Sequence, residues 1–482
     1  MMIVASIIAY FCILSCISWW ASHRATNEAF YAGERRSSWP MVAFGMVGAS
    51  VSGVTFVSVP GMVLTSAMAY LQLCMGFILG YVVVAFVLLP VYYRLNLVSI
   101  YAYLQQRLGL HSYQTGAWFF LISKIAGAAV KFYVVCIILQ QFVFSQFGVP
   151  FPLTVVGLVA FIWIYTHRGG IRTLVFTDVF QTLCLFAALL LIIYKVVASM
   201  DLTVQEACRA VMADERSRVF VFDDWASPQF FWKQFLSGVF IVVVMTGLDQ
   251  DMMQKNLTCR TLRGAQKDMC CYGLAFLPAN LLFMVLGVLL AQLFQSQGVA
   301  LPAAGDQLLP MYVGQAGMLV LLLFTIGIVA ASFSSADSAL TSLTTCFCLD
   351  ICQRPHDERL RRMAHAGFCM AFAGFILLFH GLNRTSLIDA VYVLVSYTYG
   401  PLLGLFAFGL FTRWQVADRW VPLVCVASPL LCLGVDKMVG SLTGYRFGYE
   451  LLMLNGLLTF LGLWLLREQR PEKRVGGISP QV

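Results

Sequence analysis

Long apolar stretches constrain this chain more than any other feature of its sequence. A helix needs roughly 20 apolar residues to cross the hydrocarbon core of a bilayer. Hydrophobic residues make up 60% of the 482 residues and charged residues 11%, a balance that a soluble domain does not need. The sequence therefore predicts an all-α membrane protein with about 13 transmembrane helices. The apolar stretches lie near residues 3–21, 38–64, 68–93, 113–147, 150–166, 173–199, 229–254, 269–295, 311–348, 364–380, 385–411, 420–436 and 447–466.

The basic residues predict how the chain is oriented. If the N-terminus lies outside, 21 of the 31 lysines and arginines fall on the cytoplasmic side and 8 outside, with Lys124 and Lys131 inside a span. Lysine and arginine in short loops favour the cytoplasm, so we expect the C-terminus inside, in the inner (plasma) membrane of the cell. The net charge of +8 is dispersed over many loops, which argues against a nucleic-acid partner.

One apolar stretch is interrupted in its middle. The segment "GASVSGVTFVSVPG" (48–61) holds three glycines, a proline and four hydroxyl side chains. Its stretch, 38–64, corresponds in order to 229–254, which ends in "MTGLDQDMMQK". Interruptions at matching positions of two halves indicate inverted repeats with a binding site near the midplane. Freed carbonyls at this depth need protein or water to bond them; the alternative is a helix kink packed through small residues.

A second stretch, "VAASFSSADSALTSLTT" (329–345), has a polar face at helical spacing. A carboxylate in the middle of a membrane helix costs roughly 2.5–3.5 kcal/mol on insertion scales, so it should face a cavity or a partner. Hydroxyl, carbonyl and carboxylate oxygens suit a hard cation, and we infer a small monovalent one. The polar face consists of Ser334, Asp337, Ser338, Thr341 and Thr345.

Six motifs follow one another across residues 28–415: "YAGERRSSWPMVAFGMVGASVSGVTFVSVPG", "SIYAYLQQRLG", "GGIRTLVFTDVFQ", "GLDQDMMQKNL", "SSADSALTS" and "YTYGPLLGLFAFGLFTRW". In this order they resemble the motifs of the sodium:solute symporters, the family of sodium-coupled sugar, proline, sialate, iodide and choline carriers. The resemblance implies a LeuT-type fold of two inverted five-helix repeats. Its expected parts are an extra N-terminal helix (1–27), the repeats (about 38–199 and 229–411), two C-terminal helices (416–466) and a cytoplasmic tail (467–482).

The resemblance also implies a sodium site where the interrupted helix meets the polar helix. In this sequence its ligands would be the carbonyls of Gly48, Val51 and Ala331 and the hydroxyls of Ser334 and Ser335. On this hypothesis the first helix is broken to release carbonyls for the ion, and Na+ is the coupling ion.

Some relatives bind a second sodium, and the resemblance places that possible cation site at Asp178, Asp337 and Ser338. Asp337 stands where those relatives carry a hydroxyl, so two acids here could strengthen cation binding or take a proton instead. Asp178 could equally be a structural acid near the cytoplasmic end of its helix. Lys255 replaces the family's usual arginine. The number of coupled sodium ions is therefore left open.

Two lysines bear on the identity of the solute. Lys124 and Lys131 are seven residues apart and share one helix face. Counting from Ala117 at 1.5 Å per residue puts Lys131 roughly 20 Å into the membrane, too deep for easy snorkelling. It either pairs with an acid or binds an anionic group, as a basic residue of this helix does in some relatives. We favour an anionic solute, such as sialic acid or another carboxylate.

Four further residues are predicted to contact the solute: Ser52, Thr55, Gln72 and Ser396. Tyr392 and Tyr397 lie beside the last of these, and packing is the better interpretation for both.

The predicted function is sodium-coupled import of a small solute by alternating access, with the lipid bilayer as surroundings and a monomer as a sufficient unit. The alternatives are a carrier for a sugar or another neutral solute, and a membrane sensor that acts through a partner kinase. The paired interruptions argue against a passive channel. A membrane enzyme is disfavoured because the six histidines are scattered near loop edges.

Overall fold

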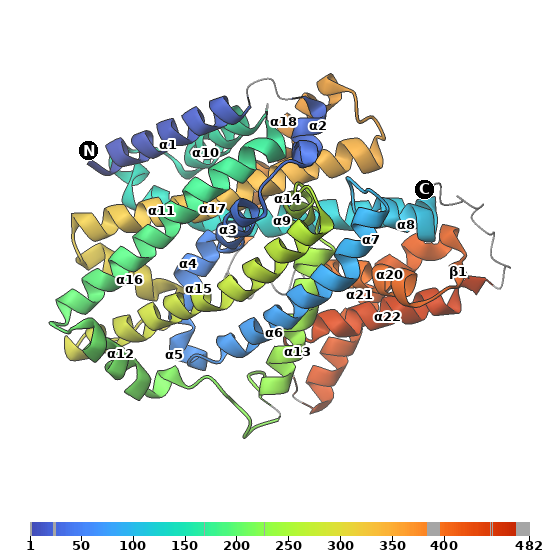
Figure 1. The fold of residues 1–482 in the computed structure, drawn as a ribbon. Helices are drawn as coiled ribbons and strands as arrows, with labels where there is room; N and C mark the ends of the chain where they lie inside the picture. The colour runs from blue at the N-terminus through green and yellow to red at the C-terminus, as the bar shows by residue number, and fades with distance from the viewer. Residues whose placement is uncertain are drawn as a thin grey trace.

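The computed structural model shows a bundle of long helices (Figure 1). It describes residues 2–22, 26–167, 169–225, 227–382, 396–443, 445 and 447–468. Two predicted segments lie partly outside this range: the apolar stretch 385–411 is described only from residue 396, and the tail 467–482 only at its first two residues.

Helices of membrane-spanning length account for most of the described chain. Eight are long and apolar enough to cross a membrane, two more are broken by a sharp bend, and three apolar helices are shorter. Together these match the thirteen predicted stretches. The long helices are α1 (Met2–Ala21), α6 (Tyr70–Val83) continued through the π-helical turn η2 (Val84–Leu88) into α7 (Leu89–Arg94), α9 (Leu110–Phe142), α11 (Gly170–Ser199), α15 (Leu262–Ser296), α17 (Met318–Cys346) with its π-helical end η7 (Phe347–Ile351), α18 (Glu358–Leu382) and α21 (Val421–Thr443). The shorter ones are α10 (Phe151–Thr166), α20 (Gly400–Phe411) and α22 (Leu451–Leu465).

The two bent helices occupy the positions that the sequence predicted. The first consists of α3 (Trp39–Ser50) and α4 (Gly53–Gly61), which leads into α5 (Val63–Ser66); the bend is 61°. The second consists of α13 (Phe231–Val242) with the π-helical turn η5 (Val243–Gly247), followed by α14 (Gln250–Asn256); the bend is 70°.

Short elements connect the spans. One of them corrects a predicted boundary: the stretch 311–348 is not one helix, because Gly317 has a φ of 86° and separates α16 from α17. The connecting elements are α2 (Asn27–Ala32), η1 (Gly33–Arg35), α8 (Ala102–Arg107), η3 (Phe144–Phe147), α12 (Val204–Ala213), η4 (Glu215–Ser217), η6 (Gly305–Gln307), α16 (Leu308–Gln315), η8 (Asp418–Trp420) and the paired strands β1 (Gln415–Val416) and β2 (Arg467–Glu468).

The first broken helix lies at the centre of the bundle. Both α3 and α4 pack against α15 and α17, and α3 also packs along α11 (Figure 1). The approach of α3 to α11 is close, because a Cβ atom added to Gly48 would lie 1.9 Å from Oγ1 of Thr182. Only glycine fits there. At the right of Figure 1, α20, α21 and α22 contact one another, and α20 and α21 also pack against α9.

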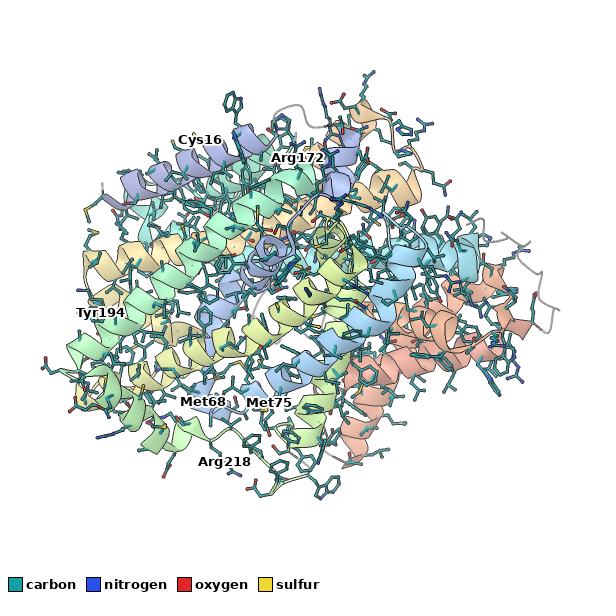
Figure 2. The ribbon with its side chains drawn as sticks, in the orientation of Figure 1. Cys16, Met68, Met75, Arg172, Tyr194 and Arg218 are labelled. Atoms are coloured by element: carbon teal, nitrogen blue, oxygen red, sulfur yellow. The ribbon has the colours of Figure 1, made fainter. Side chains whose placement is uncertain are left out.

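Two arginines mark opposite edges of the helix bundle. Figure 2 shows Arg172 and Arg218 at opposite edges of the bundle, whereas Tyr194 lies on its periphery. Arg172 pairs with Glu34 at 3.0 Å, next to α2. Tyr194 is 60% exposed on α11, as expected of a side chain that faces lipid.

Candidate functional site

The first break leaves main-chain carbonyls without helical partners. Val51 and Ser52 are extended, with ψ of 92° and 173°, so the α-helical ladder stops at Ser50. The last four carbonyls of a helix have no intrahelical donor. Val47 O is bonded by the N–H of Val51. The remaining carbonyls of that turn, including the predicted sodium ligand Gly48, must find partners outside the helix.

Helix α17 meets this break through serines that lie next to its predicted polar face. The Ser335 hydroxyl donates to the carbonyl of Ala49 at 2.7 Å, and a Cβ atom on Gly53 would lie 2.2 Å from Oγ of Ser332. Ala331, a predicted carbonyl ligand, is fully buried one turn away. The structure therefore brings together the two elements from which the sodium ligands were predicted. Uncharged oxygens from the chain and from hydroxyls are the ligands that a small hard cation prefers.

The residues of the possible second cation site have separate partners. The Ser334 hydroxyl donates to Oδ1 of Asp178 at 2.6 Å, and the ammonium of Lys255 lies 2.7 Å from Oδ2 of the same carboxylate. Asp337 accepts the hydroxyl of Tyr165 at 2.7 Å.

The third predicted residue, Ser338, points towards α14. Its hydroxyl donates to Asp251, and the side chain is buried. Side chains three and four positions apart on one helix point in similar directions, but here Asp337 and Ser338 are adjacent and bond to different helices. The predicted residues Asp178, Asp337 and Ser338 are all buried, yet the structure does not join them through one shared contact.

At the second break, ion pairs connect the start of α14 to α9. Asp249 caps the start of α14 by accepting the N–H of Asp251 at 2.9 Å. Nζ of Lys124, on α9, lies 3.1 Å from each carboxylate oxygen of Asp249 and 2.7 Å from Asp251. The Tyr399 hydroxyl donates to Asp249 at 2.7 Å. For Lys124 the structure thus shows pairing with acids, one of the two roles predicted for these lysines.

A cavity of about 150 Å³ lies between the two breaks. One wall is aromatic, from α6 and α15, and includes Tyr81 and Tyr272, whose hydroxyls bond to each other at 2.8 Å. The hydroxyls of Tyr272 and Ser50 are also bonded, which ties this wall to the first break. The polar lining residues are Ser50, Ser52, Thr55, Ser123, Lys124, Lys131, Thr246, Asp249, Asp251 and Ser335; the aromatic ones are Tyr70, Phe77, Tyr81, Tyr272, Phe276 and Tyr399.

Three of the five predicted solute contacts line this cavity. They are Ser52, Thr55 and Lys131. Lys131 differs from Lys124, because no carboxylate of the described chain forms an ion pair with it. The side-chain nitrogen of Lys131 therefore reaches the cavity with no carboxylate of the described residues at ion-pair distance.

The other two predicted contacts lie away from the cavity. The side chain of Gln72 anchors the loop before α13: its Oε1 accepts the N–H of Val221 at 3.1 Å, and its Nε2 donates to the carbonyl of Gln229 at 3.0 Å. Ser396 accepts a bond from Asn455 of α22 at its carbonyl, at 2.9 Å.

The acids of the second break and the tyrosines of the cavity wall were not predicted as site residues. The signal for Asp249 and Asp251 was present, because two acids directly follow a helix interruption in "GLDQDMMQK". Nothing in the sequence indicates that Tyr81 and Tyr272, from different spans, pack edge to face with ring centroids 4.6 Å apart.

Comparison with known proteins gives consistent results. The family model described as "Sodium:solute symporter family" matches residues 30–417. The chain is 26% identical over 418 residues to the sodium/sialic acid symporter NanT of Aliivibrio fischeri, an alignment that covers 81% of this chain and 78% of that protein. It is 24% identical over 422 residues to the sodium/sialic acid symporter SiaT of Proteus mirabilis, covering 81% and 80%.

The fold also has a solved counterpart. A structure of a Na+-coupled sialic acid symporter in a substrate-bound, outward-open state superposes with a TM-score of 0.82 at 18% identity, covering 98% of this chain and 99% of that one. The predicted LeuT-type fold is confirmed, and so is Na+ as the coupling ion of a multi-pass membrane transporter. The predicted site residues and domain boundaries stay predictions. With its family model matched over most of its length, this chain belongs to the sodium:solute symporter family.

Proposed function

We propose that this chain imports a carboxylate solute, sialic acid or a related acid, together with sodium. The observation that carries this proposal is Lys131, which lines the cavity without an ion pair to the described residues. A lysine that lines a cavity inside the bundle, away from bulk water, is costly to keep charged without an anionic partner, and a solute carboxylate would be one. A neutral sugar would leave the charge of Lys131 uncompensated. The names of NanT and SiaT, sodium/sialic acid symporters, support this choice of solute.

In this proposal sodium binds at the first break. The carbonyls of Gly48 and Val51 and the hydroxyls of Ser334 and Ser335 would contact it, with the carbonyl of Ala331 completing the set. A hydroxyl that donates one hydrogen bond keeps lone pairs for an ion, so the bond from Ser335 to α3 is compatible with sodium binding. The ion would connect α3 to α17 and so favour one arrangement of these helices.

Coupling then follows from linkage. Sodium and the solute each favour the same arrangement of the helices, and each raises the affinity of the other by the same factor. Ser52 and Thr55 lie directly after the break and line the cavity, so they are proposed to contact the solute. An inside-negative potential contributes about 2.3 kcal/mol per charge per 100 mV when net positive charge enters.

The proposed orientation has the N-terminus outside and the C-terminus in the cytoplasm of a cell whose inner (plasma) membrane holds the protein. It rests on the bias of lysine and arginine towards one side of the spans. The exposed apolar side chains along α21, α9 and α11 would face lipid. A monomer contains every residue used here, and none is assigned a catalytic role.

A thermal-stability measurement on detergent-purified protein tests the proposal. A ligand present at 100 times its Kd stabilises the folded state by about 2.7 kcal/mol. We expect sialic acid to raise the melting temperature in sodium but not in potassium. Lys131→Ala should abolish the shift caused by sialic acid and keep the shift caused by sodium alone.

Lys195→Ala is the matched control, because Lys195 is exposed at the far end of α11. It should keep both shifts. A neutral sugar that stabilises in sodium where sialic acid and other carboxylates do not would overturn the anionic proposal. Sodium-driven uptake into proteoliposomes separates a carrier from a sensor, since a sensor binds its ligand without accumulating it.

A further inference from the structure

The carboxylate of Asp178 is already neutralised by this chain. Its Oδ1 accepts the hydroxyl of Ser334 at 2.6 Å, and its Oδ2 lies 2.7 Å from Nζ of Lys255. Both charged side chains are buried, with 1% and 2% exposure. Nζ of Lys255 meets no acceptor with good hydrogen-bond geometry in the described chain, so the contact is a close ion pair. Removing either partner would leave a buried charge uncompensated.

The neighbouring acid, Asp337, has a different partner. Its Oδ2 accepts the hydroxyl of Tyr165, while its Oδ1 is buried without a hydrogen-bond partner among the described residues. Among the described residues Lys255 forms an ion pair with Asp178 and none with Asp337. At the possible second cation site the positive charge is therefore the ammonium of Lys255, which extends from α14 to Asp178 on α11.

We propose that the ammonium of Lys255 takes the place of a second coupled sodium, so that the carrier binds one sodium ion. This inference rests on the proposed sodium site at the first break. A sodium ion beside Asp178 would meet a fixed positive charge in a medium of low dielectric constant, where like charges repel strongly. Ser338, the remaining predicted ligand, is turned away and bonded to Asp251. At the first break the Ser335 hydroxyl meets a main-chain carbonyl, and Ser334 contacts the Asp178–Lys255 pair only through its hydroxyl bond to Asp178.

One consequence concerns charge movement. A monocarboxylate solute entering with one sodium carries no net charge, because the lysines stay bonded to the protein. Uptake should then depend on the sodium gradient and not on the membrane potential. Two sodium ions per monocarboxylate would instead move one positive charge per cycle, and an inside-negative potential would accelerate uptake.

Equilibrium binding of ²²Na+ to the purified protein tests the inference without any solute. We expect one ion per chain and a Hill coefficient of one. Two ions per wild-type chain would overturn the inference and leave the proposed function intact. No sodium binding at all would count against the proposed function itself, so the two failures are distinguishable.

Variants identify the cause. Lys255→Met removes the charge at similar length, and we expect it to bind two ions; Lys255→Arg keeps the charge and should bind one. If Lys255→Met folds and still binds one ion, Lys255 is not what excludes the second. Should it fail to fold, Lys255→Gln, which retains a polar end, repeats the count.

Asp337→Ser gives an independent check, because it restores the hydroxyl that the family resemblance predicts. With Lys255 in place this variant should still bind one ion. A fall from two ions in the wild type to one in Asp337→Ser would show that the second ion binds at Asp337, and the inference would be wrong.

Discussion

The two helix breaks line the same cavity, but the chemical groups that meet at each break differ. At the first break, between α3 and α4, the groups that meet are a main-chain carbonyl and the hydroxyl of Ser335. At the second, before α14, the carboxylates of Asp249 and Asp251 hold the ammonium of Lys124. Neutral oxygens can bind an ion and release it, whereas an ammonium is attached to its helix. We infer that the first break exchanges its cation and that the second keeps it.

The two breaks should therefore contribute to different quantities: the second to folding stability and the first to sodium affinity. The second break joins four elements, because Lys124 comes from α9, Ser338 from α17 and Tyr399 from the start of α20. All of these bonds are between groups of the chain itself, so we infer that they do not require sodium. In the proposed function, the first break gains further partners when a sodium ion binds. Changes at the second break should therefore act on folding, and changes at the first on sodium affinity.

The largest effect should follow from Lys124→Met. The substitution leaves two buried carboxylates without their cation, and breaking a buried ion pair in this way costs about 3–5 kcal/mol. We expect a large fall in melting temperature in detergent, with or without sodium. Lys195→Met, an exposed lysine replaced in the same way, should melt like the wild type.

A triple variant sharpens this test. Adding Asp249→Asn and Asp251→Asn to Lys124→Met removes the uncompensated charges, so much of the lost stability should return. A Lys124→Met protein as stable as the wild type would contradict the idea that the second break is held permanently by this cation.

The first break should respond in a different quantity. Ser335→Ala removes one proposed ligand and the bond to Ala49, and we expect the sodium concentration for half-saturation to rise about tenfold, which corresponds to about 1.4 kcal/mol. Without sodium, stability should fall by about 1 kcal/mol for the lost hydrogen bond. Sodium titration of thermal stability measures both.

Thr325→Val is the control on the same helix, since its hydroxyl bonds only to the carbonyl one turn back. It should leave the sodium affinity unchanged. An unaltered sodium affinity in Ser335→Ala would remove this residue from the site and weaken the comparison between the breaks.

The sequence predicted the parts of this arrangement that depend on periodicity. Helix spans, the two interruptions and the polar face of α17 all follow from patterns within one segment, and the structure confirms them. The meeting of Ser335 with the first break was predicted from family resemblance, because spacing within one helix does not reveal which other helix it faces.

The parts that the sequence did not predict depend on contacts between segments. Gln72 is polar and lies near the start of α6, but its amide bonds to the loop before α13. The position of that loop cannot be predicted from hydrophobic periodicity. Lys124 and Lys131 share one helix face but lie about 10.5 Å apart along the helix axis. Because of this separation, only Lys124 forms ion pairs with Asp249 and Asp251. Which partner each of these side chains bonds to depends on residues that are distant in the sequence.

The smallest expected effect comes from Tyr399→Phe. Its hydroxyl donates to Asp249, but Lys124 still neutralises that carboxylate when the hydroxyl is removed. The loss should therefore be close to that of one hydrogen bond, about 1 kcal/mol, seen as a modest fall in melting temperature. Sodium half-saturation should stay unchanged because the bond belongs to the second break.

Tyr397→Phe, two residues earlier, provides the comparison, because its hydroxyl bonds to Asp436 at 3.4 Å, away from both breaks. It should destabilise the protein less than Tyr399→Phe. If Tyr399→Phe instead altered sodium affinity as strongly as Ser335→Ala, the two breaks would be coupled through Asp249. The second break would then take part in ion exchange, and its lysine could not be treated as a permanent occupant.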